Sequence, residues 1–259
     1  MKDSAMLARA AAALIWLALV GCVASSVRDL DQAKQAQLVA TNVQLANGYL
    51  QRGQLDFAKE KLDKALAIDA DNSQANNMMA VLQWRFKNYD AAEEHFRRAV
   101  REDQKNSEAQ NNFGAFLCER NRVDEAEKWF RKAVANPLYK TPAAAYENAA
   151  LCFYKVKAYA KAESNFREAL AIDSGLPNSL YHMARIAYDS GRTLAARGFL
   201  QRHFHASQDT PQALLLAVRV ERKLKNKDDE ASYAVRLRGK FPTSPEAQQL
   251  TETGKDSKG

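Results

Sequence analysis

The sequence has few of the residues from which most enzyme active sites and metal centres are built. Its 259 residues include four histidines and three cysteines. It contains no glycine-rich phosphate-binding loop, no G-x-S-x-G motif and no H-E-x-x-H motif. His203 and His205 stand close together, but no cysteine or carboxylate nearby completes a recognisable ligand set. We therefore expect no catalysis, and no metal, cofactor or small-molecule substrate.

The sequence also lacks a long hydrophobic run. The apolar stretch Ala10–Val20 has eleven residues, whereas a membrane-spanning helix needs roughly 20. Lys2 and Arg9 precede the stretch, and a positive segment followed by an apolar one is typical of a secretory signal peptide. No alternation of apolar and polar residues typical of strands interrupts the rest of the chain. We expect an all-α protein behind a cleaved N-terminal segment.

The end of this segment, Leu19-Val20-Gly21-Cys22, resembles the lipobox of bacterial lipoproteins. The resemblance implies that residues 1–21 are removed and that Cys22 becomes the N-terminus, carrying a diacylglyceryl group. The alternative is an unmodified Cys22 after an ordinary signal peptide, although no A-x-A cleavage motif precedes it. Each buried CH₂ of an acyl chain contributes roughly 0.8 kcal/mol, so two or more chains give stable attachment. Val23 replaces the Asp that commonly retains lipoproteins in the inner membrane, which implies the outer membrane, facing the periplasm.

The stretch Ser107–Lys140 carries a pattern that recurs through the chain. Gly114 and Ala126 are small where two antiparallel helices must approach closely. Phe130 is large where the gap between the helices must be filled to interior density. The same pattern recurs at steps of 34 residues upstream and 36 residues downstream. The recurring pairs are Ala58 and Leu62, Ala92 and Phe96, and Ala162 and Phe166.

This period predicts six helix–turn–helix repeats. They cover residues 39–72, 73–106, 107–140, 143–176, 177–210 and 211–242. The fifth has His203 where the closing Ala belongs, and the sixth loses most of the pattern. A 34-residue unit of this kind resembles the tetratricopeptide repeat, which implies a right-handed superhelical solenoid. We expect residues 22–38 to be the lipidated cysteine and a linker, and residues 243–259 to be a polar tail, frayed or disordered.

Two cysteines remain, Cys118 and Cys152, on the first helices of the third and fourth repeats. Their positions within the repeat differ by two, which rotates their side chains by roughly 200° about a helix axis. This difference favours two small buried hydrophobic side chains. A disulfide is the alternative, because the periplasm is oxidising.

The net charge of +7 is unevenly placed. Residues 177–242 contain twelve basic and six acidic side chains. A solvated basic face accounts for this excess without any partner. The functional alternative is contact with an acidic partner or with anionic phospholipid headgroups. Nucleic acid is disfavoured, because a secreted lipoprotein does not meet it.

Tetratricopeptide proteins bind segments of other proteins in a groove lined by the first helices, so the fifth, ninth and twelfth positions of each repeat are candidates. Trp, Tyr and interleaved Asn can hold a segment through apolar contacts and backbone hydrogen bonds. Packing between repeats is the alternative for part of this set. Glu108 and Asn112 stand where the carboxylate-clamp subtype requires Lys or Arg, which argues against capture of a C-terminal carboxylate. The predicted groove residues are Asn47, Leu50, Asn77, Val81, Trp84, Asn111, Cys118, Leu151, Tyr154, Tyr181, Arg185 and Tyr188.

The lipobox and the six repeats together resemble the type IV pilus assembly lipoproteins called PilF or PilW, the pilotins. The resemblance implies that the partner is the secretin, the outer-membrane pore through which the pilus emerges, and that the protein helps the secretin to reach that membrane and multimerise. Local stretches carry the same resemblance. They are Asn111-Asn112-Phe113-Gly114, Leu138-Tyr139, Leu214-Leu215, Ala231-Ser232-Tyr233 and Phe241-Pro242.

Two alternatives from other classes remain. One is an adaptor such as the repeat-containing lipoprotein of the outer-membrane β-barrel assembly machinery, although that family has fewer and less regular repeats. The other is a periplasmic hydrolase or a regulator of peptidoglycan enzymes.

Overall fold

The structure is a computed structural model that describes residues 31–255, with side chains up to residue 250. It divides into two compact units, Met1–Asn112 and Phe113–Gly259, each of which is described by itself. The predicted signal peptide, Cys22 and the start of the predicted linker lie outside the described residues, as do residues 256–259.

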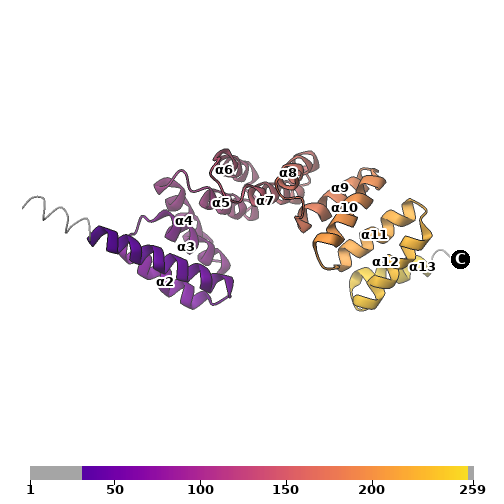
Figure 1. Cartoon of the computed structure of the whole chain (residues 1–259), viewed down its shortest axis with the longest axis horizontal. Coiled ribbons are helices and arrows are strands. Elements are labelled where there is room, and N and C mark those ends of the chain that lie inside the picture. Colours follow the sequence, from indigo (N-terminus) through magenta and orange to yellow (C-terminus); the bar gives the residue numbers. More distant parts are fainter. Residues whose placement is uncertain (1–30, 256–259) are drawn as a thin grey trace, which may run out of the picture. The chain divides into compact units, whose positions relative to one another are not determined.

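Within residues 31–255 the chain forms helices joined by short loops, and this part contains no strand (Figure 1). A helix over residues 31–51 comes first. The helices that follow are α2 (Leu55–Ile68), α3 (Ser73–Arg85), α4 (Tyr89–Glu102), α5 (Ser107–Glu119), α6 (Val123–Ala135), α7 (Pro142–Lys155), α8 (Tyr159–Ile172), α9 (Pro177–Asp189), α10 (Thr193–Ala206), α11 (Pro211–Lys223), α12 (Lys227–Lys240) and α13 (Pro245–Lys255). The predicted all-α class is confirmed. No helix of this part is both long and apolar enough to cross a membrane.

The turn inside each helix pair uses the same backbone conformation six times. The residue at the fifteenth position of every predicted repeat has a positive φ. Glycine and asparagine adopt this left-handed region readily, whereas it costs other residues roughly 1–2 kcal/mol. The recurrence shows that the hairpins share one geometry despite their different sequences. The residues are Gly53 (71°), Lys87 (62°), Asn121 (63°), Lys157 (61°), Gly191 (80°) and Lys225 (59°).

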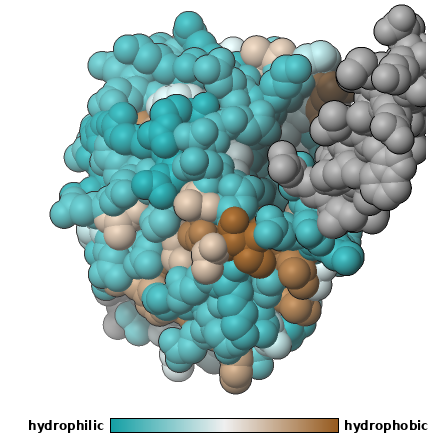
Figure 2. Space-filling model, turned by 90° about the vertical axis from the view of Figure 1, so that its left-hand side faces the viewer, coloured by the Kyte–Doolittle hydropathy of each residue, from teal (hydrophilic) through white to brown (hydrophobic). Residues whose placement is uncertain are grey.

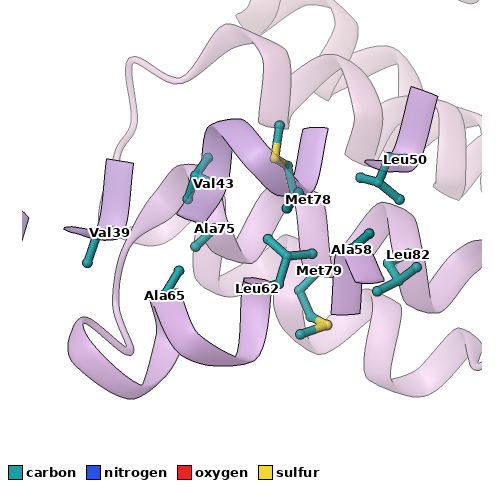
Figure 3. Packing of buried hydrophobic residues seen from close by; sticks show 11 residues of the cluster. Val39, Val43, Leu50, Ala58, Leu62, Ala65, Ala75, Met78, Met79 and Leu82 are labelled. Atoms are coloured by element: carbon teal, nitrogen blue, oxygen red, sulfur yellow. The ribbon is translucent and has the colours of Figure 1, made fainter. Parts of the chain in front are cut away.

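In each of the first five hairpins the second helix carries an alanine near its start that is 0 % exposed. In the first compact unit the second helix α2 supplies Leu62 and Ala65 to a cluster that also contains Met79 and Leu82 of α3 (Figure 3). In the second compact unit a Cβ atom added to Gly114 would lie 2.8 Å from Cε1 of Phe130. The predicted close approach at Gly114 is therefore confirmed. The five alanines are Ala58, Ala92, Ala126, Ala162 and Ala196.

His203, which replaces the closing alanine of the fifth repeat, is a structural residue. It is 4 % exposed, and its Nδ1 lies 3.0 Å from the carbonyl oxygen of Pro177. This contact ties the end of α10 to the start of α9. Among the described residues no three His, Cys, Asp or Glu side chains come together as a metal site would require.

The predicted disordered tail contains a packed helix, so that part of the prediction is wrong. Ala247 and Leu250 of α13 are 3 % and 5 % exposed, and they pack in a cluster with Leu214, Val218 and Leu237. Helix α13 thus covers apolar side chains of α11 and α12. The sequence signal was weak because α13 offers only these two apolar contacts among polar residues.

The interpretation of Cys118 and Cys152 as unlinked buried side chains is also wrong. They form a disulfide between α5 and α7, with their Cα atoms 5.7 Å apart. The first helices of adjacent repeats lie side by side, and each presents opposite faces to its two neighbours. A rotation of roughly 200° therefore lets Cys118 lie on the side of α5 that faces α7, and Cys152 on the side of α7 that faces α5.

The contact at Gly114 predicts opposite effects for two glycine-to-alanine changes. Gly114→Ala should lower the free energy of unfolding by about 1–3 kcal/mol, because the ring of Phe130 must shift. Gly198→Ala is the matched control, because a Cβ at this glycine in α10 meets no atom within 4 Å. It should raise stability by up to about 1 kcal/mol through helix propensity. Urea unfolding of both variants measures this, and equal effects would contradict the predicted contact.

The disulfide predicts a stability that depends on reductant. Opening a bond that closes a segment of 34 residues should cost about 2–4 kcal/mol, because the unfolded chain regains freedom. Urea unfolding with and without dithiothreitol measures this. The double variant Cys118→Ala, Cys152→Ala should resemble the reduced protein and ignore the reductant. Wild-type protein that unfolds at the same urea concentration in both conditions would rule out the bond.

Candidate partner-binding groove

In the first compact unit the predicted groove residues divide into buried and accessible ones. Leu50 and Asn77 are 6 % and 1 % exposed. The backbone carbonyl of Leu50 accepts a hydrogen bond from Nη1 of Arg85 (3.0 Å), and Oδ1 of Asn77 accepts one from Nδ2 of Asn112 (3.1 Å). Asn111 is also buried. These residues serve the packing between repeats.

The accessible residues of this unit are Asn47, Val81 and Trp84. Asn47 is exposed, and Val81 and Trp84 are half-buried. The Trp84 ring packs edge-on against Phe96, with centroids 6.4 Å apart. These three side chains are the part of the predicted set on which a partner could rest in this unit.

A pocket of about 340 Å³ lies beside the helix over residues 31–51. Val39 and Val43 of that helix and Ile68 of α2 give it an apolar lining, and Gln35 and Asn72 add polar groups. The face of the molecule in Figure 2 is mostly hydrophilic, and its hydrophobic residues show in several small groups. Of these pocket residues only Val43 stands in a column that the sequence analysis considered, and the predicted groove did not include it.

In the second compact unit Cys118 is taken up by the disulfide and is 8 % exposed. The remaining predicted residues of this unit are half-buried, so each retains an accessible part. They are Leu151 and Tyr154 on α7, and Tyr181, Arg185 and Tyr188 on α9. A second pocket of about 240 Å³, between α6, α7 and α8, is lined by other residues, among them Phe130, Tyr146 and Phe153.

The tyrosines of α7 and α9 meet around His182, which the sequence prediction missed. The His182 ring lies 4.5 Å from the ring of Tyr154 and 5.3 Å from that of Tyr181, measured between centroids. It also stacks on Phe166, at 5.5 Å. Its Nδ1 is buried and has no hydrogen-bond partner in the described part of the chain. In the sequence, only its place next to Tyr181 could have suggested that His182 lies among these aromatic rings.

Burial and the nearby positive charge of Arg185 lower the pKa of His182 from 6.5 to about 4. The neutral imidazole therefore persists in the folded protein at pH values where an exposed histidine is charged. A neutral ring suits its place between three aromatic side chains, because a charged ring would lose its hydration there.

Many basic side chains near the C-terminus are paired within the protein. Arg192 donates hydrogen bonds to both carboxylate oxygens of Glu163, each 2.7 Å long, and these hold the pKa of Glu163 at about 2. Arg197 pairs with the buried carboxylate of Glu221. Several basic side chains of residues 177–242 are thus paired, but most of their partners belong to the same region, so most of its basic excess remains.

Repeated hairpins with a shared turn and a recurring alanine contact define this protein as a tetratricopeptide-repeat solenoid, as the sequence predicts. The family described as Tetratricopeptide repeat matches residues 49–111 and 83–137. Proteins of this class are scaffolds for protein–protein interaction.

The comparison with single proteins is more specific. The type IV pilus assembly protein PilF of Pseudomonas aeruginosa is 31 % identical over 249 residues, which are 92 % of this chain and 97 % of PilF. A solved structure of P. aeruginosa PilF is 29 % identical, covers 85 % of this chain and 99 % of its own, and superposes with a TM-score of 0.79. The structure of PilW, a widely conserved type IV pilus biogenesis factor, is also 29 % identical. It covers 83 % of this chain and 99 % of its own, and superposes with a TM-score of 0.74. The chain belongs to the PilF/PilW family of tetratricopeptide-repeat proteins of type IV pilus biogenesis.

His182 predicts a loss of stability in weak acid. Its pKa is about 4 in the folded protein and 6.5 as the ordinary value, so the unfolded chain takes up the proton first as the pH falls. The contribution of the neutral, buried His182 ring to the free energy of unfolding is therefore complete above about pH 6.5, and it is lost as the pH falls from about 6.5 to 4. His182→Phe keeps a ring in place and should remove about 2 kcal/mol of the difference in unfolding free energy between pH 7.5 and 4.5.

Urea unfolding at the two pH values measures this difference. His205→Gln is the matched control, because His205 is exposed at the end of α10. It should leave the pH dependence of the wild type unchanged. If His182→Phe keeps the full wild-type dependence, burial of the imidazole is not its cause.

Proposed function

We propose that this protein is a pilotin, an outer-membrane lipoprotein that binds the secretin of the type IV pilus and promotes its localisation and multimerisation. The observation that carries the proposal is the 31 % identity to PilF over nearly the full length of both chains. A likeness of that extent includes the whole solenoid rather than one generic repeat. It therefore favours a common role in pilus assembly over the barrel-assembly adaptor.

The proposed location rests on the sequence Leu19-Val20-Gly21-Cys22. A lipid on Cys22 would hold the solenoid at the periplasmic side of the outer membrane. The disulfide between Cys118 and Cys152 supports a periplasmic location, because such bonds persist in oxidising compartments.

The proposed mode of binding rests on the accessible residues of the first helices. Trp84 in one compact unit and Tyr154, Tyr181 and Tyr188 in the other are half-buried aromatic side chains. Such residues contribute a large share of the binding energy at protein interfaces, because they bury much surface at little entropic cost. A secretin segment lying on the aromatic side chains of either unit would be held to the membrane through the lipid.

The test compares secretin multimers on unboiled gels from wild-type cells, a strain without the gene, and a Cys22→Ala strain. We expect no multimers in the deletion strain. In the Cys22→Ala strain we expect secretin in the wrong membrane fraction, because the unlipidated protein cannot reach the outer membrane. Ser25→Ala, a substitution close to the lipobox that keeps the cysteine, should behave as wild type.

Immunoblots of the protein itself establish that each variant is present at wild-type amount. Intact multimers in the deletion strain would reject the proposal. Intact multimers together with poorly assembled outer-membrane barrels would favour the barrel-assembly adaptor instead.

A further inference from the structure

Aromatic and basic side chains form a connected surface on three first helices of the second compact unit. Tyr181, Arg185 and Tyr188 follow one another at spacings of four and three residues on α9, so they share one face of that helix. Helix α9 contacts both α7 and α11. We call this surface the aromatic–basic face; its residues are Tyr154 on α7, Tyr181, Arg185 and Tyr188 on α9, and Arg219 and Lys223 on α11.

Ring contacts make this face continuous from α7 to α11. Tyr154 and Tyr181 both touch the ring of His182, as described above. On the other side of α9, Nζ of Lys223 lies 5.1 Å from the centroid of the Tyr188 ring. A chain segment laid across the three helices would therefore meet both tyrosines and cations.

The end of the face at α7 and α9 has the donors that a carboxylate needs. The hydroxyl groups of Tyr154 and Tyr181 form no hydrogen bond within the described residues. The guanidinium of Arg185 is near enough to both phenols to interact with them electrostatically. Two hydroxyl donors beside a guanidinium match the several lone pairs of a carboxylate.

The end of the face at α11 carries cations that no carboxylate of the described part neutralises. Nη2 of Arg219 donates to a neutral acceptor, Oε1 of Gln249, at 2.9 Å. Lys223 lies over Tyr188 and belongs to no ion pair of that part. This distinguishes both from Arg192 and Arg197, whose charges are paired.

We propose that the aromatic–basic face binds an extended acidic segment of a protein partner. One carboxylate of the segment would lie at Tyr154, Tyr181 and Arg185, and a second at Arg219 and Lys223. Packed helices lie about 8–10 Å apart, and an extended chain rises about 3.3 Å per residue. The two acidic residues should therefore be about three positions apart. The inference rests on the proposed function in taking a protein segment as the ligand, and it adds the chemistry of that segment.

Asp189 is the internal competitor of such a segment. Its Oδ2 accepts a hydrogen bond from Nε of Arg185 at 2.9 Å, and half of the Asp189 side chain is exposed, 50 %. Exposed ion pairs four residues apart on a helix are weak. An incoming carboxylate can share or replace this contact, and removal of the Asp189 charge should strengthen binding.

The test starts from linear 12-residue random peptides displayed on phage and selected on the immobilised mature protein. We expect the enriched peptides to carry Asp or Glu at positions three apart. The best acidic peptide is then synthesised with a fluorescent label and titrated with the protein and its variants by fluorescence polarisation. Arg185→Gln and Lys223→Gln should each weaken binding by about tenfold. Asp189→Asn should tighten binding by about threefold.

Arg238→Gln is the matched control, because it removes the same charge from an exposed position on α12. It should change the affinity less than twofold. Enriched peptides without an acidic excess would overturn the inference. So would an Arg238→Gln variant as weak as Arg185→Gln, since binding would then follow overall charge.

Vesicles of phosphatidylcholine and phosphatidylglycerol (three to one) test the lipid alternative by co-sedimentation. Vesicle binding that depends on Arg185 and Lys223, without binding of acidic peptides, would overturn the inference in favour of a membrane contact. The secretin gel separates this inference from the proposed function. If multimers need the gene but form normally with Arg185→Gln and Lys223→Gln together, this inference fails and the pilotin proposal stands. If multimers form without the gene but the acidic peptides bind as predicted, the pilotin proposal fails and this inference stands.

Discussion

The close approach of two helices at one small residue is the constraint on which the rest of this structure depends. Ala58, Ala92, Ala126, Ala162 and Ala196 have no exposed surface. A larger side chain at any of them would separate the helices of its hairpin, and every contact to the next repeat would move with it, because each repeat of a solenoid contacts only its neighbours. The sixth repeat lacks this alanine and is packed differently. Glu230 occupies the alanine's position, Leu237 is the buried residue of α12, and α13 covers the exposed end.

Because the hairpin contact uses few positions, the outward face of each first helix is left free to vary. In the first compact unit much of that face has been absorbed into packing, as the buried Leu50, Asn77 and Asn111 show. In the second compact unit the corresponding positions carry Tyr154, Tyr181 and Tyr188, which stay half accessible. The same scaffold thus supports a structural column in one unit and a chemically distinct surface in the other. Family membership accounts for the scaffold, and the variable positions are where a partner would be chosen.

The spacing of small and large residues predicted the all-α class, the hairpins and the contact of Gly114 with Phe130, because these depend on local periodicity alone. The groove was predicted less well. A position in the repeat says which way a side chain points from its own helix, but not how much of it the next helix covers. Asn77 and Val81 both stand at candidate groove positions, yet Asn77 is buried and Val81 is partly accessible. His182 was missed because its role comes from rings on α7 and α8 as well as on its own helix. Helix α13 was missed because two apolar residues are too few to establish a period.

The disulfide fixes the packing of the third repeat against the fourth, which the repeat pattern alone does not predict. The step from the third to the fourth repeat is 36 residues rather than 34, and the two additional residues lie in the loop between α6 and α7. A longer loop specifies less strongly how the next hairpin docks, since its own conformations are more numerous. Cys118 and Cys152 join α5 to α7 across this junction and fix the relation of the two first helices covalently. The cross-link therefore lies where the repeat pattern by itself determines the packing least, and it ends on α7, the first of the helices that carry the aromatic–basic face. The disulfide thus adds to the packing of α7 against α6 and α8, and an oxidising compartment, in which such bonds persist, would favour the fold that presents this face.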